Sequence, residues 1–316
     1  MVCPQTGTAC REIMFDMGHK EFNSTFTRDC PAPLNVHYQS VIYLSAFVYD
    51  TLWSLHLSQP RAISFSMLST VRDAVPKTAQ SRMLHVWVDL CVHIAEISNI
   101  IYTNPLLDSY SRAHLLQSEQ RLQSHYDALP PDLSYRQMSV GELDTMGYTY
   151  HMQFYSARIA LHRALLQSIL GRDHENPLPI DDTGQYTPSS SANVIYESAV
   201  HITNLVLNYK QIFGPDKMVP VMVYSIYMAA TSLVSHVLFL QGLGTLADKD
   251  VKRIRYLVDT LSQSQEHFPV ASRMCRTILE GFGASSLGCT GQLHQRQDKL
   301  PTHDITALQV NHPGTR

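Results

Sequence analysis

Charged side chains are scarce in this sequence. Lys, Arg, Asp and Glu make up 16% of the 316 residues, whereas about a quarter is usual for a globular domain. This shortage argues against wide solvated faces and favours helices packed in several layers. The net charge of −3 also argues against a chain that grips nucleic acid by itself, because phosphate binding normally needs a basic face. Two small basic clusters are assigned to solvated helix faces: Lys252, Arg253 and Arg255, and Arg273 and Arg276.

Cysteines are few and are badly spaced for a metal site. The six lie at positions 3, 10, 30, 91, 275 and 289. A binuclear zinc cluster needs six cysteines in one Lys/Arg-rich block, so we expect no metal site in this chain. Cys91 lies in an apolar helical pattern, which indicates a buried thiol. The first residues contain no apolar run for a signal peptide, so we expect a reducing intracellular setting.

Catalytic signatures are also missing from the sequence. It has no Gly-x-Ser-x-Gly elbow, and no strand pattern precedes its glycine-containing stretches. His174 lacks the second histidine of a zinc-protease helix. Asp181 and Asp182 lie in a loop rich in Pro, Gly and Ser, with no further carboxylate at helical spacing. We therefore predict that the protein is not an enzyme.

The periodicity of apolar residues is helical almost throughout. Apolar residues recur at three- and four-residue steps, and no run alternates as a strand does. We predict an all-α fold, a multi-helix array with helices at residues 35–57, 81–102, 111–128, 141–170, 195–213, 219–240, 247–264 and 268–282. The expected domains are an N-terminal segment 1–33, one helical domain 34–285 with a loop or disordered insert at 171–192, and a disordered tail 286–316.

The segment 219–240 is the most apolar of these helices. It has no ionisable acid or base except His236, and its length would span a bilayer. A helix that is apolar all round can equally be the central helix of a bundle. Because amphipathic helices precede and follow it, we predict a fully apolar central core helix and no membrane contact. An integral membrane protein remains the other interpretation.

Two pairs of aromatic residues invite a binding hypothesis. Tyr150 and Phe154 share one predicted helix, and Tyr224 and Tyr227 share another. Aromatic residues at helical spacing usually belong to the core. A pocket for a flat apolar effector, lined by these four side chains, is the secondary hypothesis.

The end of the first helix carries a recognisable pattern. In "VIYLSAFVYDTLWSLHLSQPRAIS" (41–64), an apolar helix leads to Asp50, then to Trp53 and Ser54, and then to Pro60. This segment resembles the middle homology region of the regulatory domain of fungal zinc-binuclear-cluster transcription factors. The family has a Gly-Arg-Pro turn here, whereas this chain has Ser58-Gln59 before the proline. We expect an altered turn, a cationic or backbone donor for Asp50, and a partial replacement of the lost charge by Arg61.

Three further segments resemble the same family, in the same order. The first, "CREIMFDMGHKEFN" (10–23), carries Asp16, Gly18 and His19. The second, "HMQFYSARIALHRALL" (151–166), carries His162 and Arg163. The third, "SANVIYESAVHITNLVLNYKQ" (191–211), precedes the wholly apolar helix. The resemblance covers roughly residues 10–285, and it implies structural or regulatory roles for these motif residues.

The resemblance implies a transcription regulator in the nucleus. Such a domain would act through protein partners of the transcription machinery, a homodimer or a small effector. Zinc and DNA would be bound only by an N-terminal module that this sequence lacks, so we expect a truncated gene model, a fragment or a paralogue without DNA binding. The alternative is an all-helical enzyme or small-molecule-binding protein of secondary metabolism.

Overall fold

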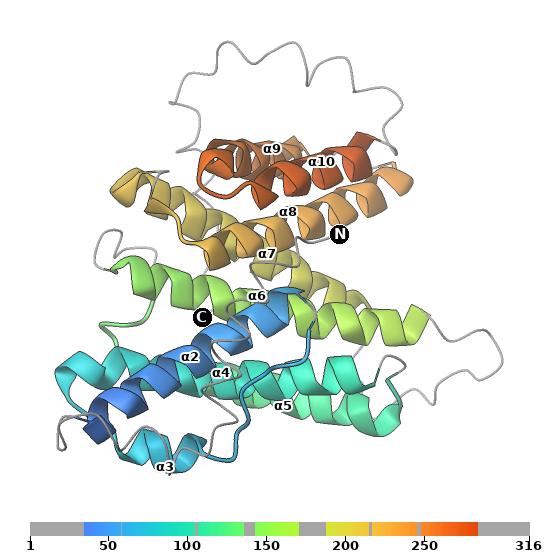
Figure 1. The fold of residues 1–316 in the computed structure, drawn as a ribbon. Coiled ribbons are helices and arrows are strands. Elements are labelled where there is room, and N and C mark those ends of the chain that lie inside the picture. The colour runs from blue at the N-terminus through green and yellow to red at the C-terminus, as the bar shows by residue number, and fades with distance from the viewer. Residues whose placement is uncertain are drawn as a thin grey trace. The chain divides into compact units, whose positions relative to one another are not determined.

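The computed structural model describes residues 35–283, except for Ser58 and residues 105–106, 136–142, 171–187, 215–216 and 245–247. Within these ranges every regular element is helical (Figure 1), so the predicted all-α fold is confirmed. The predicted segment 1–33 and tail 286–316 lie outside the described residues, as does most of the predicted insert 171–192.

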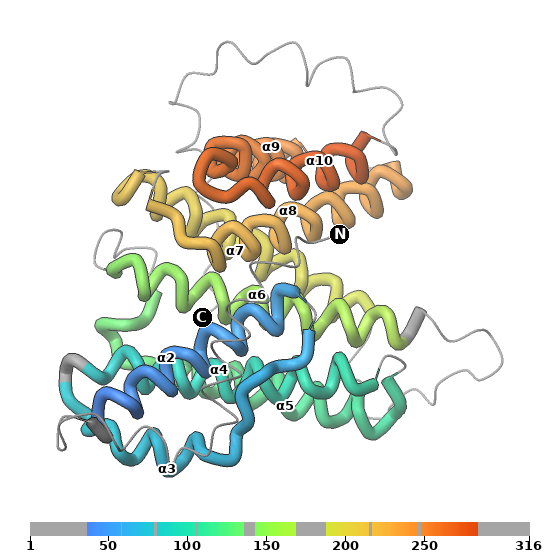
Figure 2. Tube along the Cα trace, in the orientation of Figure 1, coloured from blue at the N-terminus to red at the C-terminus, as the bar shows by residue number. Residues whose placement is uncertain are grey.

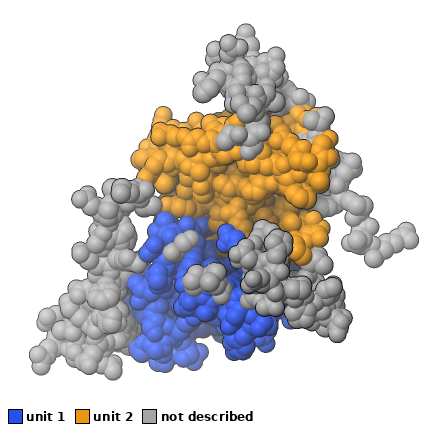
Figure 3. All heavy atoms as spheres, turned by 90° about the vertical axis from the view of Figure 1, so that its right-hand side faces the viewer, with its two compact units in different colours: residues 1–129, 164–177 blue, residues 130–163, 178–316 orange. Residues whose placement is uncertain are grey.

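The chain divides into two compact units (Figure 3). Unit 1 consists of residues 1–129 and 164–177, and unit 2 of residues 130–163 and 178–316. Helix α6 (Thr145–Leu170) contributes residues to both. The expectation that residues 34–285 act as one regulatory domain stays a prediction.

Besides its part of α6, unit 1 contains four consecutive helices (Figures 1 and 2). They are α2 (Asn35–Leu57), α3 (Leu68–Asp73), α4 (Ala79–Thr103) and α5 (Ser109–Asp127). Helix α4 packs against both α2 and α5, and α3 packs against α2. The completely buried apolar side chains of this unit are Leu44, Phe47, Val88, Leu90, Cys91, Ile94, Ala95, Ile97, Leu115 and Leu122.

Unit 2 contains the later helices. Besides its part of α6, it has α7 (Pro188–Phe213), α8 (Pro220–Gly242), α9 (Asp248–Gln263), the 3-10 helix η3 (Ser264–Glu266) and α10 (Val270–Gly283). Helix α8 packs against α7, α9 and α10, and Figure 1 shows α9 and α10 side by side on α8. Large side chains in its core include Tyr148, Tyr150, Met152, Phe154, Tyr209, Ile226, Leu233, Leu257 and Leu261.

Side-chain caps set where several helices begin. Asp108 accepts a hydrogen bond from the N–H of Ser111 at 2.7 Å, so α5 starts at residue 109. Asp144 accepts one from the N–H of Gly147, also at 2.7 Å. Such caps satisfy N–H groups that have no partner inside the helix. Helix α6 therefore begins at Thr145, four residues later than the periodicity indicates.

Helix α7 begins earlier than predicted, and this corrects one boundary. The predicted insert 171–192 includes residues 188–192, but α7 starts at Pro188. Proline suits the first turn of a helix, because its φ is already helical and its missing N–H would have had no partner there. The Pro/Ser-rich composition of "PSSSA" therefore opens a helix.

Helix α8 is only partly enclosed. Its buried side includes Met222, Ile226 and Leu233, whereas Phe239 is 66% exposed. Two helical segments, Ser81–Thr103 and Pro220–Gly242, are long and apolar enough to cross a membrane, and about half of each is buried in the structure. Core helices share this length and composition. A central position for α8 in the whole array stays a prediction.

Candidate functional site

The connector between α2 and α3, residues 59–67, is held to the end of α2 by hydrogen bonds. Pro60 disfavours a helical conformation for the residue before it, and α2 ends at Leu57. The Gln59 N–H donates to the carbonyl of Ser54 at 3.2 Å. In return the Ser54 hydroxyl donates to the carbonyl of Gln59. The motif serine thus joins the helix to the residue before the proline.

Asp50 binds the part of the same connector that follows Pro60. Its Oδ2 accepts hydrogen bonds from the backbone N–H of Ala62 at 2.9 Å and of Ile63 at 2.8 Å. The expectation of a donor for Asp50 is therefore confirmed, and the donors are backbone amides. Charge-assisted bonds of this kind are stronger than neutral ones. The carboxylate ties the last turns of α2 to the chain beyond Pro60.

Arg61 lies next to this carboxylate. Burial lowers the pKa of Arg61, and the negative charge of Asp50 acts in the opposite direction. The guanidinium carbon stands 4.1 Å from the centre of the Phe65 ring, as in a cation–π pair. The expectation that Arg61 places a cation beside Asp50 is supported. Its equivalence to the family's arginine stays a prediction.

Helix α4 completes the end of α2. The Tyr102 hydroxyl donates to the carbonyls of Ser54 and Leu55 at 3.2 and 3.0 Å. These carbonyls lie in the last turn, where no N–H of the helix can reach them. The Cys91 thiol is fully buried, as predicted, and burial raises its pKa. Of the other motif residues, Trp53 is half-buried and Pro60 is exposed.

The second motif, His162 and Arg163, lies in the part of α6 that belongs to unit 2. The Arg163 Nη2 donates to Thr231 Oγ1 at 2.8 Å and to Ser232 Oγ at 2.9 Å, both on α8. Burial lowers the pKa of this guanidinium. His162 is buried, and its Nδ1 lies 3.1 Å from Ser191 Oγ on α7. The two adjacent residues thereby connect α6 to two different helices.

The four aromatic residues of the effector hypothesis occupy different environments. Tyr150 and Phe154 are almost completely buried in α6, at 2% and 1% exposure. Tyr224 and Tyr227, on α8, are half-buried. Burial raises the pKa of Tyr224, while the charge of Arg273 opposes this rise. A pocket formed by all four stays a prediction. Asp16, Gly18 and His19 lie outside the described residues.

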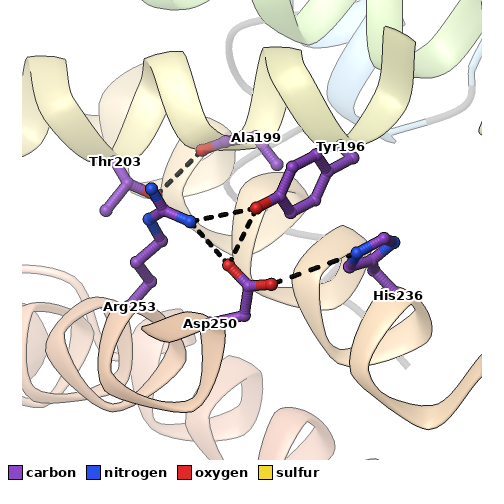
Figure 4. A network of polar contacts seen from close by, with 6 residues as sticks. All are labelled: Tyr196, Ala199, Thr203, His236, Asp250 and Arg253. Atoms are coloured by element: carbon purple, nitrogen blue, oxygen red, sulfur yellow. Dashed lines mark hydrogen bonds and ion pairs between the residues drawn. The ribbon is translucent and has the colours of Figure 1, made fainter. Parts of the chain in front are cut away.

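A polar network in unit 2 was not foreseen (Figure 4). The Arg253 Nη1 donates to Asp250 Oδ1 at 2.6 Å and to the Tyr196 oxygen at 3.1 Å. The Tyr196 hydroxyl donates to the same carboxylate oxygen at 3.2 Å. On the other side, the His236 Nε2 lies 4.0 Å from Asp250 Oδ2. Helices α7, α8 and α9 each supply at least one member.

This network corrects the assignment of one basic cluster. Arg253 is only 5% exposed and Asp250 only 6%, so the assignment of Arg253 to a solvated face was wrong. Lys252 and Arg255 are exposed, as expected. Helical spacing in the sequence could have shown this burial, because residues 250, 253, 257 and 261 lie on the same face of α9. A charged pair at that spacing faces the core.

The members of the network largely satisfy one another, which favours a structural role. Burial, and then the charge of Asp250, raises the pKa of Tyr196, so this phenol stays neutral. The rings of Tyr196 and His236 are 4.2 Å apart. Among the described residues, no group of three or more His, Cys, Asp or Glu side chains is placed to hold a metal ion. The network joins three helices around one buried charge pair.

Breaking the buried pair on one side should be costly. Asp250→Ala leaves Arg253 buried without its carboxylate, so we expect a loss of about 3–5 kcal/mol in the free energy of unfolding. Replacing both residues, as Asp250→Leu with Arg253→Met, should cost less than the single change. Urea unfolding followed by circular dichroism measures both. Asp259→Asn, at an exposed position of α9, is the matched control. A single variant no less stable than the double variant would contradict this account.

His151 should make unit 2 sensitive to acid. Burial lowers its pKa to about 4, although the Leu133 carbonyl, 2.9 Å from Nε2, opposes the shift. Between pH of about 6.5 and about 4 the unfolded chain binds a proton that the folded chain does not, so stability falls as the pH falls. The loss reaches about 3 kcal/mol at the acid end. His151→Gln should flatten the curve of unfolding free energy against pH. Identical curves for the two proteins would rule this role out.

The comparisons with known proteins add no relative. No protein-family model, no curated protein and no solved structure matches the chain. The motif residues and their contacts within each unit are therefore the observations that bear on function.

Proposed function

We propose that the chain is a regulatory domain of a fungal transcription factor and that it acts in the nucleus. It would control transcription by contact with protein partners or a small effector. A module outside these residues would bind DNA, and it would also hold the zinc that DNA binding requires in this family. The protein would accordingly have no catalytic activity of its own.

The observation that carries the proposal is the connector of Asp50. The segment that resembles the family's most recognisable motif forms one closed local structure, in which Asp50, Ser54 and Arg61 all take part. The motif residues contact backbone groups and an aromatic ring. Residues with such contacts position a turn, so their pattern can identify a fold family without implying chemistry.

A second observation supports the same interpretation. The two residues of the second matched motif, His162 and Arg163, also connect helices. Arg163 is half-buried, and its partners on α8 are neutral oxygens. Both motifs thus fix helix positions, as expected in a regulatory domain that transmits binding through helix packing.

Tethering to DNA tests the proposed role. The chain, fused to an unrelated DNA-binding domain, should change transcription of a fungal reporter gene severalfold relative to that domain alone. The purified chain should not shift promoter DNA, because its net charge is −3. The fusion with Tyr110→Glu, a change at a 74% exposed position, should behave as the wild type. A reporter that responds to no fusion, although the protein is folded, would overturn the proposal.

A further inference from the structure

Two histidines lie side by side where α4 packs against α5 in unit 1. The ring centres of His93 on α4 and His125 on α5 are 5.3 Å apart, and both side chains are half-buried. One turn away, Glu96 on α4 pairs with Arg121 on α5. The pairs 93–125 and 96–121 show that the two helices run antiparallel here. The two imidazoles are therefore part of the contact between the helices.

The charges beside these imidazoles already neutralise one another. Arg121 Nη2 lies 3.1 Å from Glu96 Oε2. On the other side, Arg72 Nη1 of α3 lies 2.6 Å from Asp89 Oδ1 of α4. The two carboxylates are about one turn before and one turn after His93 on the same face of α4. Two ion pairs thus flank the histidines, and neither leaves a carboxylate to balance added positive charge.

Helix α2 packs on the other side of α4. Cys91 and Tyr102 contact backbone carbonyls of α2. At about 3.6 residues per turn, they lie about 200° and about 180° around α4 from His93. Besides two histidines and three tyrosines, the titratable side chains of α2 are limited to Asp50, which accepts amides of the connector. The charges that act on the histidine pair therefore come from α3, α4 and α5.

The surroundings of the pair disfavour the charged form of both rings. A protonated imidazole carries an N–H at each nitrogen. The Nδ1 of His93 is buried and has no hydrogen-bond partner in the described part of the chain, and a buried donor without an acceptor costs free energy. Burial lowers the pKa of both histidines; Glu96 opposes this at His93, whereas the charge of His93 adds to it at His125.

Helix α5 has little buried apolar surface. The residues that it buries are Ser111, Leu115, Ser118, Glu119 and Leu122, of which only the two leucines are apolar. Elements with few buried apolar contacts open at a lower free energy than the rest of a structure. Repulsion at the histidine pair therefore acts on a helix that is weakly held.

We propose that the His93–His125 pair is an acid-sensitive contact that holds α5 against α4 at neutral pH and releases it at acid pH. Neutral rings pack between the two ion pairs. Once both rings are protonated, two like charges lie side by side in a half-buried site, and α5 separates. The packed helices bind fewer protons than the separated ones, so the contact weakens as the pH falls below about 6.5. The inference goes beyond the proposed function and does not depend on it.

Hydrogen exchange of the full chain at about pH 7.5 and about pH 5, read as protection factors that correct for the intrinsic effect of pH, measures this release. From the higher to the lower pH, α5 in the wild type should lose at least about tenfold more protection than α4, because one unit of lowered pKa corresponds to a factor of ten. The double variant with His93→Gln and His125→Gln should lose this difference. His114→Gln, at an exposed position of α5, should behave as the wild type.

These measurements can also reject the proposal. Equal loss of protection in α4 and α5 would mean that unit 1 unfolds as a whole and would overturn it. A selective loss in α5 that persists in the double variant would overturn it as well, because the two histidines would then not be its cause.

The Glu96–Arg121 ion pair separates the effect of charge from that of packing. Glu96→Gln and Arg121→Gln remove the same ion pair but leave opposite charges beside His93. Between the two pH values, the loss of α5 protection should be larger than in the wild type for Glu96→Gln, because Arg121 then opposes protonation alone. It should be smaller for Arg121→Gln, since Glu96 can then balance a protonated ring. Losses that change in the same direction would contradict the proposal.

Discussion

The carboxylate of Asp50 and the two amides that it accepts are the contact on which the connector after α2 depends. The chain leaves α2 after Leu57, so the N–H groups of Ala62 and Ile63 need an acceptor from elsewhere. Asp50 supplies it from the helix that the chain has just left. With these amides fixed, Arg61 lies over Phe65, and the Tyr43 hydroxyl reaches the carbonyl of Ser64 at 2.9 Å.

In unit 2, too, hydrogen bonds of polar side chains hold neighbouring segments in place. Its helices are apolar on their packed faces, and apolar surfaces alone do not fix one arrangement. Gln153 donates to Ser225 Oγ at 2.9 Å, and Arg163 reaches two hydroxyls on the same helix α8. The Asp250–Arg253 pair adds α9 and α7. A buried polar group with all of its partners restricts the packing to an arrangement that keeps them.

The sequence predicts the helices better than it predicts their polar contacts. The predicted bounds of α2 agree with the structure, because Pro60 gives the end of the helix at Leu57 a strong local cause. The start of α7 was missed, since Pro188 suits both a loop and a first turn. Asp50 was expected to find a donor, but the network of Tyr196, His236, Asp250 and Arg253 was not expected. Its members lie up to 57 residues apart in sequence, and only packing brings them together.

Hydrogen exchange at Ala62 and Ile63 tests the central claim most directly. Both residues lie outside any helix, and the Asp50 carboxylate accepts a hydrogen bond from each of their amides. In the wild type we expect these two amides to exchange at least about tenfold more slowly than they do in Asp50→Ala, in line with a charge-assisted bond of about 1.5–3 kcal/mol. Exchange in the α5 helix should not change. Equal rates at Ala62 and Ile63 in the two proteins would contradict the account.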